Sequence, residues 1–153
     1  MKQRTRGYLA ICLATSLMTG TVMAGGHQSG ESNEVKYRVN VMNALGSQFG
    51  ALAMVFTRRI DQPDNLQLHT EALATTAKLT ASLFPEGSAG GKSLPVIWDE
   101  PEKFAAAVKD LEDSTAALAA AASSGDRAAV AKAFKDAGAS CKGCHERYKE
   151  EDE

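Results

Sequence analysis

Apolar residues recur at alternating spacings of four and three through four segments of the chain, and no other feature constrains the fold as strongly. This period matches the turn of an α-helix, so each segment is predicted to be a helix with one apolar stripe. We expect the helices over about residues 35–56, 64–83, 101–122 and 130–148. In the first segment, the stripe consists of Val35, Val39, Met42, Gly46, Phe49, Ala53 and Phe56.

Helix-breaking segments separate the four predicted helices. Arg58–Asp64 contains a proline, Ser123–Asp126 contains a glycine, and Phe84–Pro95 holds two prolines and three glycines. No stretch alternates with the two-residue period of a strand, so we predict no sheet. The sequence therefore predicts an all-α fold, an antiparallel four-helix bundle with two short connections.

The N-terminus has the form of a secretory signal peptide. Lys2, Arg4 and Arg6 precede a short apolar run from Tyr8 to Met18, and small residues end the segment at Ala24. The run is shorter than a membrane span, although an uncleaved anchor is the alternative. We therefore expect residues 1–24 to be a signal peptide, residues 25–153 to be one periplasmic domain, and no membrane span after cleavage.

The charge of the mature chain limits its partners. The leader holds three of the 17 basic residues and none of the 19 acidic ones, so cleavage leaves a net charge of −5. An acidic protein of this kind is not expected to bind nucleic acid or anionic membranes. The charge permits a basic protein partner without identifying one.

The motif Cys141-Lys142-Gly143-Cys144-His145 lies near the end of the fourth predicted helix. C-x-x-C-H is the attachment pattern of c-type haem, because two thiols one turn apart share a helix face and the following imidazole can reach the iron. Both cysteines occupy stripe positions, so one covalent haem c is expected inside the bundle, near the C-terminal helix. Cys12 is removed with the leader.

Two other readings of the same cysteine pair stay open. The pair could form a redox disulfide, but thioredoxin-like sites begin a helix after a strand and this motif ends a helix. It could supply half of a zinc site, but no second cysteine pair exists. Of the remaining histidines, His69 lies among polar residues and is expected to be exposed, and His27 lies in the Gly/Ser-rich N-terminal segment. Neither is expected to be a metal ligand.

The chain resembles the class II c-type cytochromes, the cytochrome c′ family, in which four helices precede a C-x-x-C-H motif near the C-terminus. The resemblance extends over about residues 34–149. It rests on the opening helix (Val35–Arg38, Met42, Leu45, Phe49–Gly50), the loop (Phe84–Ser88, Pro95–Trp98, Phe104) and the attachment site (Ala139–His145, Tyr148–Lys149).

The resemblance implies roles for the residues of the attachment site. Cys141 and Cys144 would form the thioether bonds to haem, and His145 would be the proximal ligand of the iron. Lys149 stands where a basic residue usually lies close to the proximal imidazole. Lys149 could also belong to the solvated, charged tail. Family members often pair as homodimers through their first two helices.

The resemblance also implies roles for two residues of the first helix. Arg38 stands where the family has an arginine near a haem propionate, although an ordinary surface arginine is the alternative. Met42 stands on the distal side of the iron. A methionine there binds iron in the low-spin relatives and only crowds an open site in high-spin members. Met42 could equally fill a gap in the core.

Three function hypotheses follow. The first is an exported one-electron carrier whose redox partner the sequence does not identify. The second is a five-coordinate haem protein that binds nitric oxide or carbon monoxide under Met42. The third is a thiol-disulfide enzyme that uses Cys141 and Cys144. No nucleophile with a base, carboxylate pair or phosphate loop is evident, so we do not expect an enzyme. Trp98 is expected to anchor the loop by packing.

The motif and the leader together predict a covalent haem on the exported protein. After acid-acetone extraction, the colour should stay with the polypeptide because thioether bonds survive extraction. The intact mass should equal residues 25–153 plus one haem. A colourless protein with a Cys141–Cys144 disulfide would contradict this interpretation.

Overall fold

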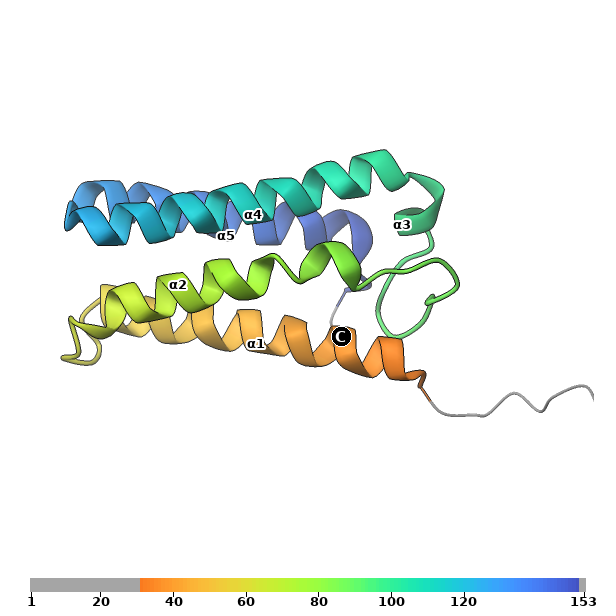
Figure 1. The fold of residues 1–153 in the computed structure, drawn as a ribbon, viewed down its shortest axis with the longest axis horizontal. Coiled ribbons are helices and arrows are strands. Elements are labelled where there is room, and N and C mark those ends of the chain that lie inside the picture. The colour runs from red at the N-terminus through yellow and green to blue at the C-terminus, as the bar shows by residue number, and fades with distance from the viewer. Residues whose placement is uncertain (1–30, 152–153) are drawn as a thin grey trace, which may run out of the picture.

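The computed structural model describes residues 31–151 (Figure 1). The predicted signal peptide and its cleavage site lie outside this range. The elements are α1 (Asn33–Phe56), α2 (Asn65–Ala77), the 3₁₀-helix η1 (Thr80–Ser82), α3 (Val96–Asp99), α4 (Pro101–Ser124) and α5 (Arg127–Tyr148).

The four long helices form the predicted bundle. α1 packs against α2, α2 against α4, and α4 against α5. Figure 1 shows the α1–α2 and α4–α5 connections at one end of the bundle, with α3 and the chain's C-terminus at the other. Each helix therefore runs antiparallel to the next long helix in the chain, and α1 also runs antiparallel to α5. The described residues contain no strand, so the all-α prediction is confirmed.

Local side chains determine where several helices begin and end. The Ser32 hydroxyl accepts a hydrogen bond from the Val35 amide at the start of α1. The Asp126 carboxylate accepts bonds from Ala128 and Ala129 at the start of α5. Such caps satisfy amides that the first helical turn leaves without partners. Gly125 ends α4 with φ of 72°, a left-handed conformation that glycine adopts at no steric cost.

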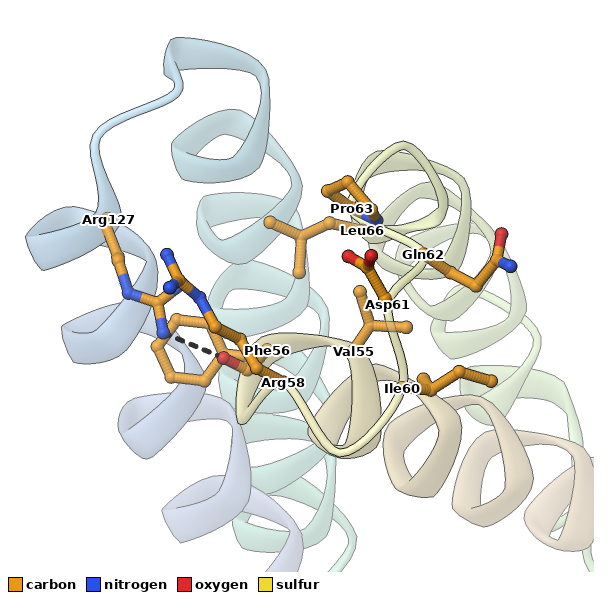
Figure 2. A pocket seen from close by; sticks show the side chains of 9 residues that line it. All are labelled: Val55, Phe56, Arg58, Ile60, Asp61, Gln62, Pro63, Leu66 and Arg127. Carbon is orange, nitrogen blue, oxygen red and sulfur yellow. Dashed lines mark hydrogen bonds between the residues drawn. The ribbon is translucent and has the colours of Figure 1, made fainter.

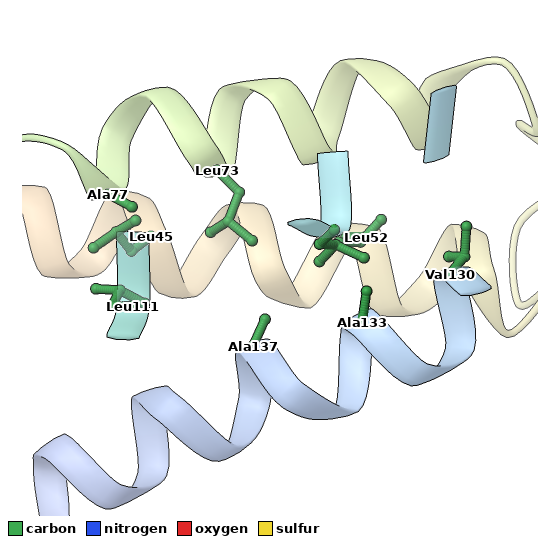
Figure 3. Packing of buried hydrophobic residues seen from close by; sticks show 9 residues of the cluster. Leu45, Leu52, Leu73, Ala77, Leu111, Val130, Ala133 and Ala137 are labelled. Atoms are coloured by element: carbon green, nitrogen blue, oxygen red, sulfur yellow. The ribbon is translucent and has the colours of Figure 1, made fainter. Parts of the chain in front are cut away.

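Two apolar clusters form the core. The first cluster, drawn in Figure 3, takes residues from all four long helices and occupies the middle of the bundle. The small alanine side chains of α5 face the larger side chains of α1 and α2 in this cluster (Figure 3). The first cluster contains Leu45, Leu52, Leu73, Ala77, Leu111, Leu118, Val130, Ala133 and Ala137. The second cluster contains Ile97, Phe104, Val108 and Tyr148.

The structure corrects three details of the predicted helices. α2 ends at Ala77, earlier than predicted, and the chain continues through η1. Residues 96–99 form the short helix α3 within the predicted connection. Two members of the predicted apolar stripe, Val39 and Gly46, are exposed, Val39 to 42%, whereas Arg38 is only 3% exposed. The difference arises because the loop after η1 covers the side of α1 that carries Val35 and Arg38, which a helical period alone does not predict.

Among the described residues, α1 is the one helix that bears on the prediction that no membrane span remains after cleavage. By length and composition it could cross a bilayer, with a mean hydropathy of 1.3 in its most apolar window. Core helices of bundles pass the same test. The apolar side chains of α1 contribute to the first cluster, as expected for a bundle helix.

Candidate functional site

The Cys-x-x-Cys-His motif occupies the last two turns of α5. Both thiols are free and half-buried. Cys141 packs against the first apolar cluster and Cys144 against the second. His145 follows on the exposed side of the helix. A group attached to both sulfurs would therefore lie where the two clusters meet.

Burial raises the pKa of both thiols. The pKa of Cys141 lies above its ordinary value, and that of Cys144 is raised to about 11, mainly by burial and also by the neighbouring Cys141. Both thiols are therefore protonated at neutral pH. Reactive C-x-x-C sites depend on a thiolate formed at a lowered pKa, so these surroundings disfavour the thiol-disulfide hypothesis.

The available ligands suit a haem better than a bare metal ion. Among residues 31–151, no group of three or more His, Cys, Asp or Glu side chains could hold a metal ion. A structural zinc site needs four protein ligands. A porphyrin supplies four nitrogen ligands itself, so its iron needs only one or two more from the protein. The two free thiols and the adjacent imidazole meet the needs of a covalently attached haem.

Stacked aromatic rings define how α1 lies against α5. The ring centroids of Phe49 and Phe134 are 4.5 Å apart with an interplanar angle of 9°. Gly138 lies in the same contact, since a Cβ there would approach the Phe49 ring to 3.3 Å. Phe56 also stacks on Phe134, with centroids 5.7 Å apart. These contacts determine the relative register of the two antiparallel helices.

This register brings Met42 level with the first cysteine of the motif. Met42 lies seven residues before Phe49, and Cys141 lies seven residues after Phe134. Seven residues correspond to about 10 Å along each helix axis, in the same direction because the helices are antiparallel. Met42 and Cys141 also pack against the same cluster. The structure therefore brings Met42 and the motif to the same end of the bundle core.

The same register brings Arg38 level with His145. Arg38 lies eleven residues before Phe49, and His145 lies eleven residues after Phe134. Two pairs of residues therefore lie at similar heights along the two helices, Met42 with Cys141 and Arg38 with His145. The sequence assigned all four to one site, and only the stacked rings show how the two helices align.

Arg38 holds the loop after η1 against α1. Its Nη1 donates to the Leu83 carbonyl and the Ser88 hydroxyl, both at 3.3 Å, and its Nη2 donates to the carbonyls of Ser88 and Gly90, both at 3.0 Å. The guanidinium also lies 4.9 Å from the centroid of the Phe84 ring. Burial lowers the pKa of Arg38, while Glu31 raises it. Arg38 is therefore a buried clamp, not an ordinary surface arginine.

Lys149 lies where the chain leaves α5. Its amide donates to the His145 carbonyl at 3.1 Å, and its backbone pairs with Ser93 in an isolated bridge. The Leu94 amide donates to the Tyr148 carbonyl at 3.0 Å, and the Glu150 amide donates to the Lys92 carbonyl at 2.9 Å. The C-terminal end of α5 is thus fastened to residues 92–94, which sets the position of Lys149 beside the motif.

Aromatic side chains connect this end of α5 with α4 and the loop, an arrangement that the sequence interpretation missed. Tyr148 packs edge-on against Phe104, and Phe104 packs edge-on against Phe84, with centroids 5.0 and 4.8 Å apart. Trp98 packs against the second cluster, which confirms the expected anchor, and it donates its indole N–H to the Pro85 carbonyl at 3.1 Å. The edge contacts join residues that are distant in sequence, so no local pattern predicts them.

His69 is less exposed than the sequence predicts. It is half-buried, not exposed, and its Nδ1 lies 2.8 Å from Oε1 of Gln48. This contact joins α2 to α1 in the part of the bundle that the first cluster occupies. His27 lies outside the described residues.

Comparisons with known proteins agree with this geometry. A family model described as "Cytochrome C'" matches residues 33–149. A cytochrome c′ of Pararhodospirillum photometricum is 34% identical over 119 residues, which cover 76% of this chain and 95% of the relative. A cytochrome c-556 of Agrobacterium fabrum (strain C58) is 31% identical over 97% of this chain and 98% of the relative. A nitric oxide complex of a mutant cytochrome c prime from Alcaligenes xylosoxidans has a TM-score of 0.73 at 32% identity, covering 77% of this chain and 94% of that one.

The Arg38 clamp predicts a specific loss of stability. Arg38→Lys keeps the charge but cannot serve four acceptors with the planar geometry of a guanidinium. We expect the free energy of unfolding to fall by about 2–4 kcal/mol, measured by urea titration of the holoprotein, because buried acceptors lose their charged donor. Arg59→Lys is the matched control, because Arg59 is exposed in the turn that follows α1. Equal unfolding midpoints for the two variants would show that the clamp contributes nothing.

The position of the two cysteines predicts that haem attachment stabilises the bundle. The double variant Cys141→Ala, Cys144→Ala cannot attach haem, so the two apolar clusters should lose their contacts with it. Buried apolar contact equivalent to several side chains, each contributing ~1.5–3 kcal/mol, would be missing. We expect lower helicity by circular dichroism and a broad melting transition. A melt as cooperative as that of the holoprotein, at the same temperature, would instead mean that the haem is peripheral.

Proposed function

This chain belongs to the cytochrome c′ family, and on that premise we propose that it is an exported carrier of single electrons. It is a c-type haem protein, and its cofactor is covalently bound haem c. Haem iron supplies one-electron redox chemistry, and a second axial ligand from methionine raises its reduction potential. The choice between electron transfer and gas binding then depends on the protein residues that face the iron.

Three residues of α5 are proposed to hold the cofactor. Cys141 and Cys144 supply the two sulfurs, and His145 supplies the proximal imidazole. The two free, half-buried thiols and the adjacent exposed imidazole support this assignment. Lys149 is proposed to lie near the proximal imidazole, because its amide hydrogen-bonds to the carbonyl of His145.

Met42 is proposed as the distal axial ligand, and its alignment with Cys141 is the observation that carries the electron-transfer proposal. The stacked rings of Phe49 and Phe134 bring the two residues level on facing helices. Met42 is half-buried against the apolar cluster that Cys141 also contacts. Low polarity around a thioether favours its use as an iron ligand over exchange with water.

Arg38 is proposed to act on the haem through the loop that it holds. Its two terminal nitrogens donate to acceptors in residues 83–90, so these four bonds do not involve its Nε. A propionate contact through Nε is compatible with that clamp. The guanidinium would then bind the loop and the cofactor together.

Sequence and surface features also bear on where the protein acts and what it contacts. The leader over residues 1–24 supports export to the periplasm, and the acidic mature chain supports a basic redox partner. The exposed apolar side chains Tyr37 and Met54 on α1 and Leu68 on α2 support pairing of two copies through these helices. The proposal assigns the protein no catalytic reaction.

A second candidate function is the binding of nitric oxide or carbon monoxide. The observation that favours it is the likeness to a cytochrome c prime structure described as a nitric oxide complex. In that case, Met42 would serve only to pack against the first cluster and would not bind iron. Whether Met42 binds iron therefore separates the two functions.

Substitution of Met42 distinguishes ligation from packing. Met42→Leu keeps the apolar volume but removes the sulfur. If Met42 binds iron, the wild type should be low-spin with a thioether charge-transfer band in the near-infrared. The variant should become high-spin, fall in reduction potential and bind carbon monoxide. Met54→Leu, at a 46% exposed position of the same helix, is the matched control and should change none of these properties.

A different result would favour the second function. A wild type that is already high-spin and binds carbon monoxide would remove the basis for electron transfer through a His/Met pair. Met42→Leu should then leave the spin state unchanged and alter only the rate of gas binding. Absorption spectra of both proteins, oxidised and reduced, are sufficient to decide.

A further inference from the structure

A half-open cavity lies at the opposite end of the bundle from the haem motif (Figure 1). Its volume is about 410 Å³, and it lies between the α1–α2 connection and the start of α5. Val55, Phe56 and Leu66 provide apolar walls, and Ile60 lies at the outer side. This volume is within the range of about 300–1,000 Å³ typical of pockets for small molecules. None of the residues assigned to the haem site lines the cavity.

Arg127 is held in place at this cavity by two contacts. Its Nη2 donates to the Phe56 carbonyl at 2.9 Å, and its guanidinium lies 4.9 Å from the centroid of the Phe56 ring. These contacts fix the side chain between the end of α1 and the start of α5 (Figure 2). A guanidinium fixed in this way loses less conformational freedom when it binds an anion.

Arg58 supplies a second positive charge from a strained position. Its φ is 57°, and it is the one non-glycine residue with positive φ in the part of the chain that the structure describes. Glycine would adopt this conformation more easily, so the arginine here carries a conformational cost. Figure 2 shows the guanidinium groups of Arg58 and Arg127 directed toward one another at one side of the cavity.

One carboxylate, that of Asp61, lies on the cavity wall opposite this pair of arginines. No ion pair between Asp61 and Arg58 or Arg127 is present among the described residues, although all three line the same cavity. The cavity thus combines two converging guanidinium groups, one acidic side chain and apolar walls. The excess of positive charge beside apolar walls complements a molecule with an anionic head and a short apolar tail.

We propose that this cavity binds a small amphiphilic carboxylate. The carboxylate group binds between Arg58 and Arg127, where paired guanidinium groups match its geometry. The alkyl tail lies against Val55, Phe56 and Leu66. The Asp61 carboxylate repels the carboxylate of the ligand and so weakens binding. Neutralising Asp61 should therefore strengthen binding.

Isothermal titration calorimetry of the holoprotein with hexanoate tests the proposal. We expect Arg58→Gln to weaken hexanoate binding about tenfold, through loss of a charged hydrogen bond, without disturbing the bond between Arg127 and Phe56. Arg59→Gln is the matched control, since this neighbouring arginine does not line the cavity, and it should bind as the wild type does. Asp61→Asn should tighten binding several-fold by removing the repulsion.

Two further ligands and one spectrum complete the test. Hexan-1-ol has the tail without the charge and acetate has the charge without the tail, so both should bind more weakly than hexanoate. The haem absorption spectrum should stay unchanged during the titration, because the cavity is remote from the motif. Equal affinity for hexan-1-ol, no effect of Arg58→Gln, or a haem spectral change that follows binding would each overturn the proposal.

Discussion

The stacking of Phe49 on Phe134 is the contact on which the geometry of the haem site depends. It joins α1 to α5, the helices that carry the proposed distal and proximal ligands. The packing of α1 on α2, of α2 on α4 and of α4 on α5 places the two helices, and the stacked rings are the direct contact between them. A shift of one helical turn would separate Met42 from Cys141 by about 5 Å along the axis. Gly138 keeps the rings close, because a side chain there would press on the Phe49 ring. The contact lies two turns from the motif and can therefore hold the register without occupying space beside the cysteines.

At the haem end, polar contacts add to the apolar and aromatic packing around the motif. Arg38 binds three backbone carbonyls of the loop after η1, and the backbone beyond α5 pairs with residues 92–94. Both contacts fix loop segments whose glycines and prolines would otherwise leave them variable. A buried arginine stabilises such a loop only when its hydrogen bonds are formed, so the loop and the helix depend on each other. These contacts fix the loop after η1 and the C-terminal end of α5 beside the motif.

The two ends of the bundle differ in their chemistry. The haem end gathers half-buried thiols, a thioether and edge-packed aromatic rings, all near neutral apolar clusters. The opposite end gathers two arginines around an apolar cavity. Because the long helices keep these ends apart, an anion bound at one end would act on the other only through the packing of the bundle. Membership of the cytochrome c′ family explains the haem end, whereas the arginine cavity rests on the structure of this chain alone.

The sequence by itself determined the all-α class, the four helices and the attachment motif, because helical period and the C-x-x-C-H spacing are local properties of the chain. It also indicated Met42 and Arg38, but only through resemblance to a family. The alignment of Met42 with Cys141, the burial of Arg38 in place of Val39 and the aromatic contacts of Tyr148 were decided by tertiary structure. Each depends on which residues from distant segments pack together, and a helical period fixes a face only within its own helix. The end of α2 at Ala77 has the same origin, since the chain there leaves the helical path for the loop that Arg38 binds.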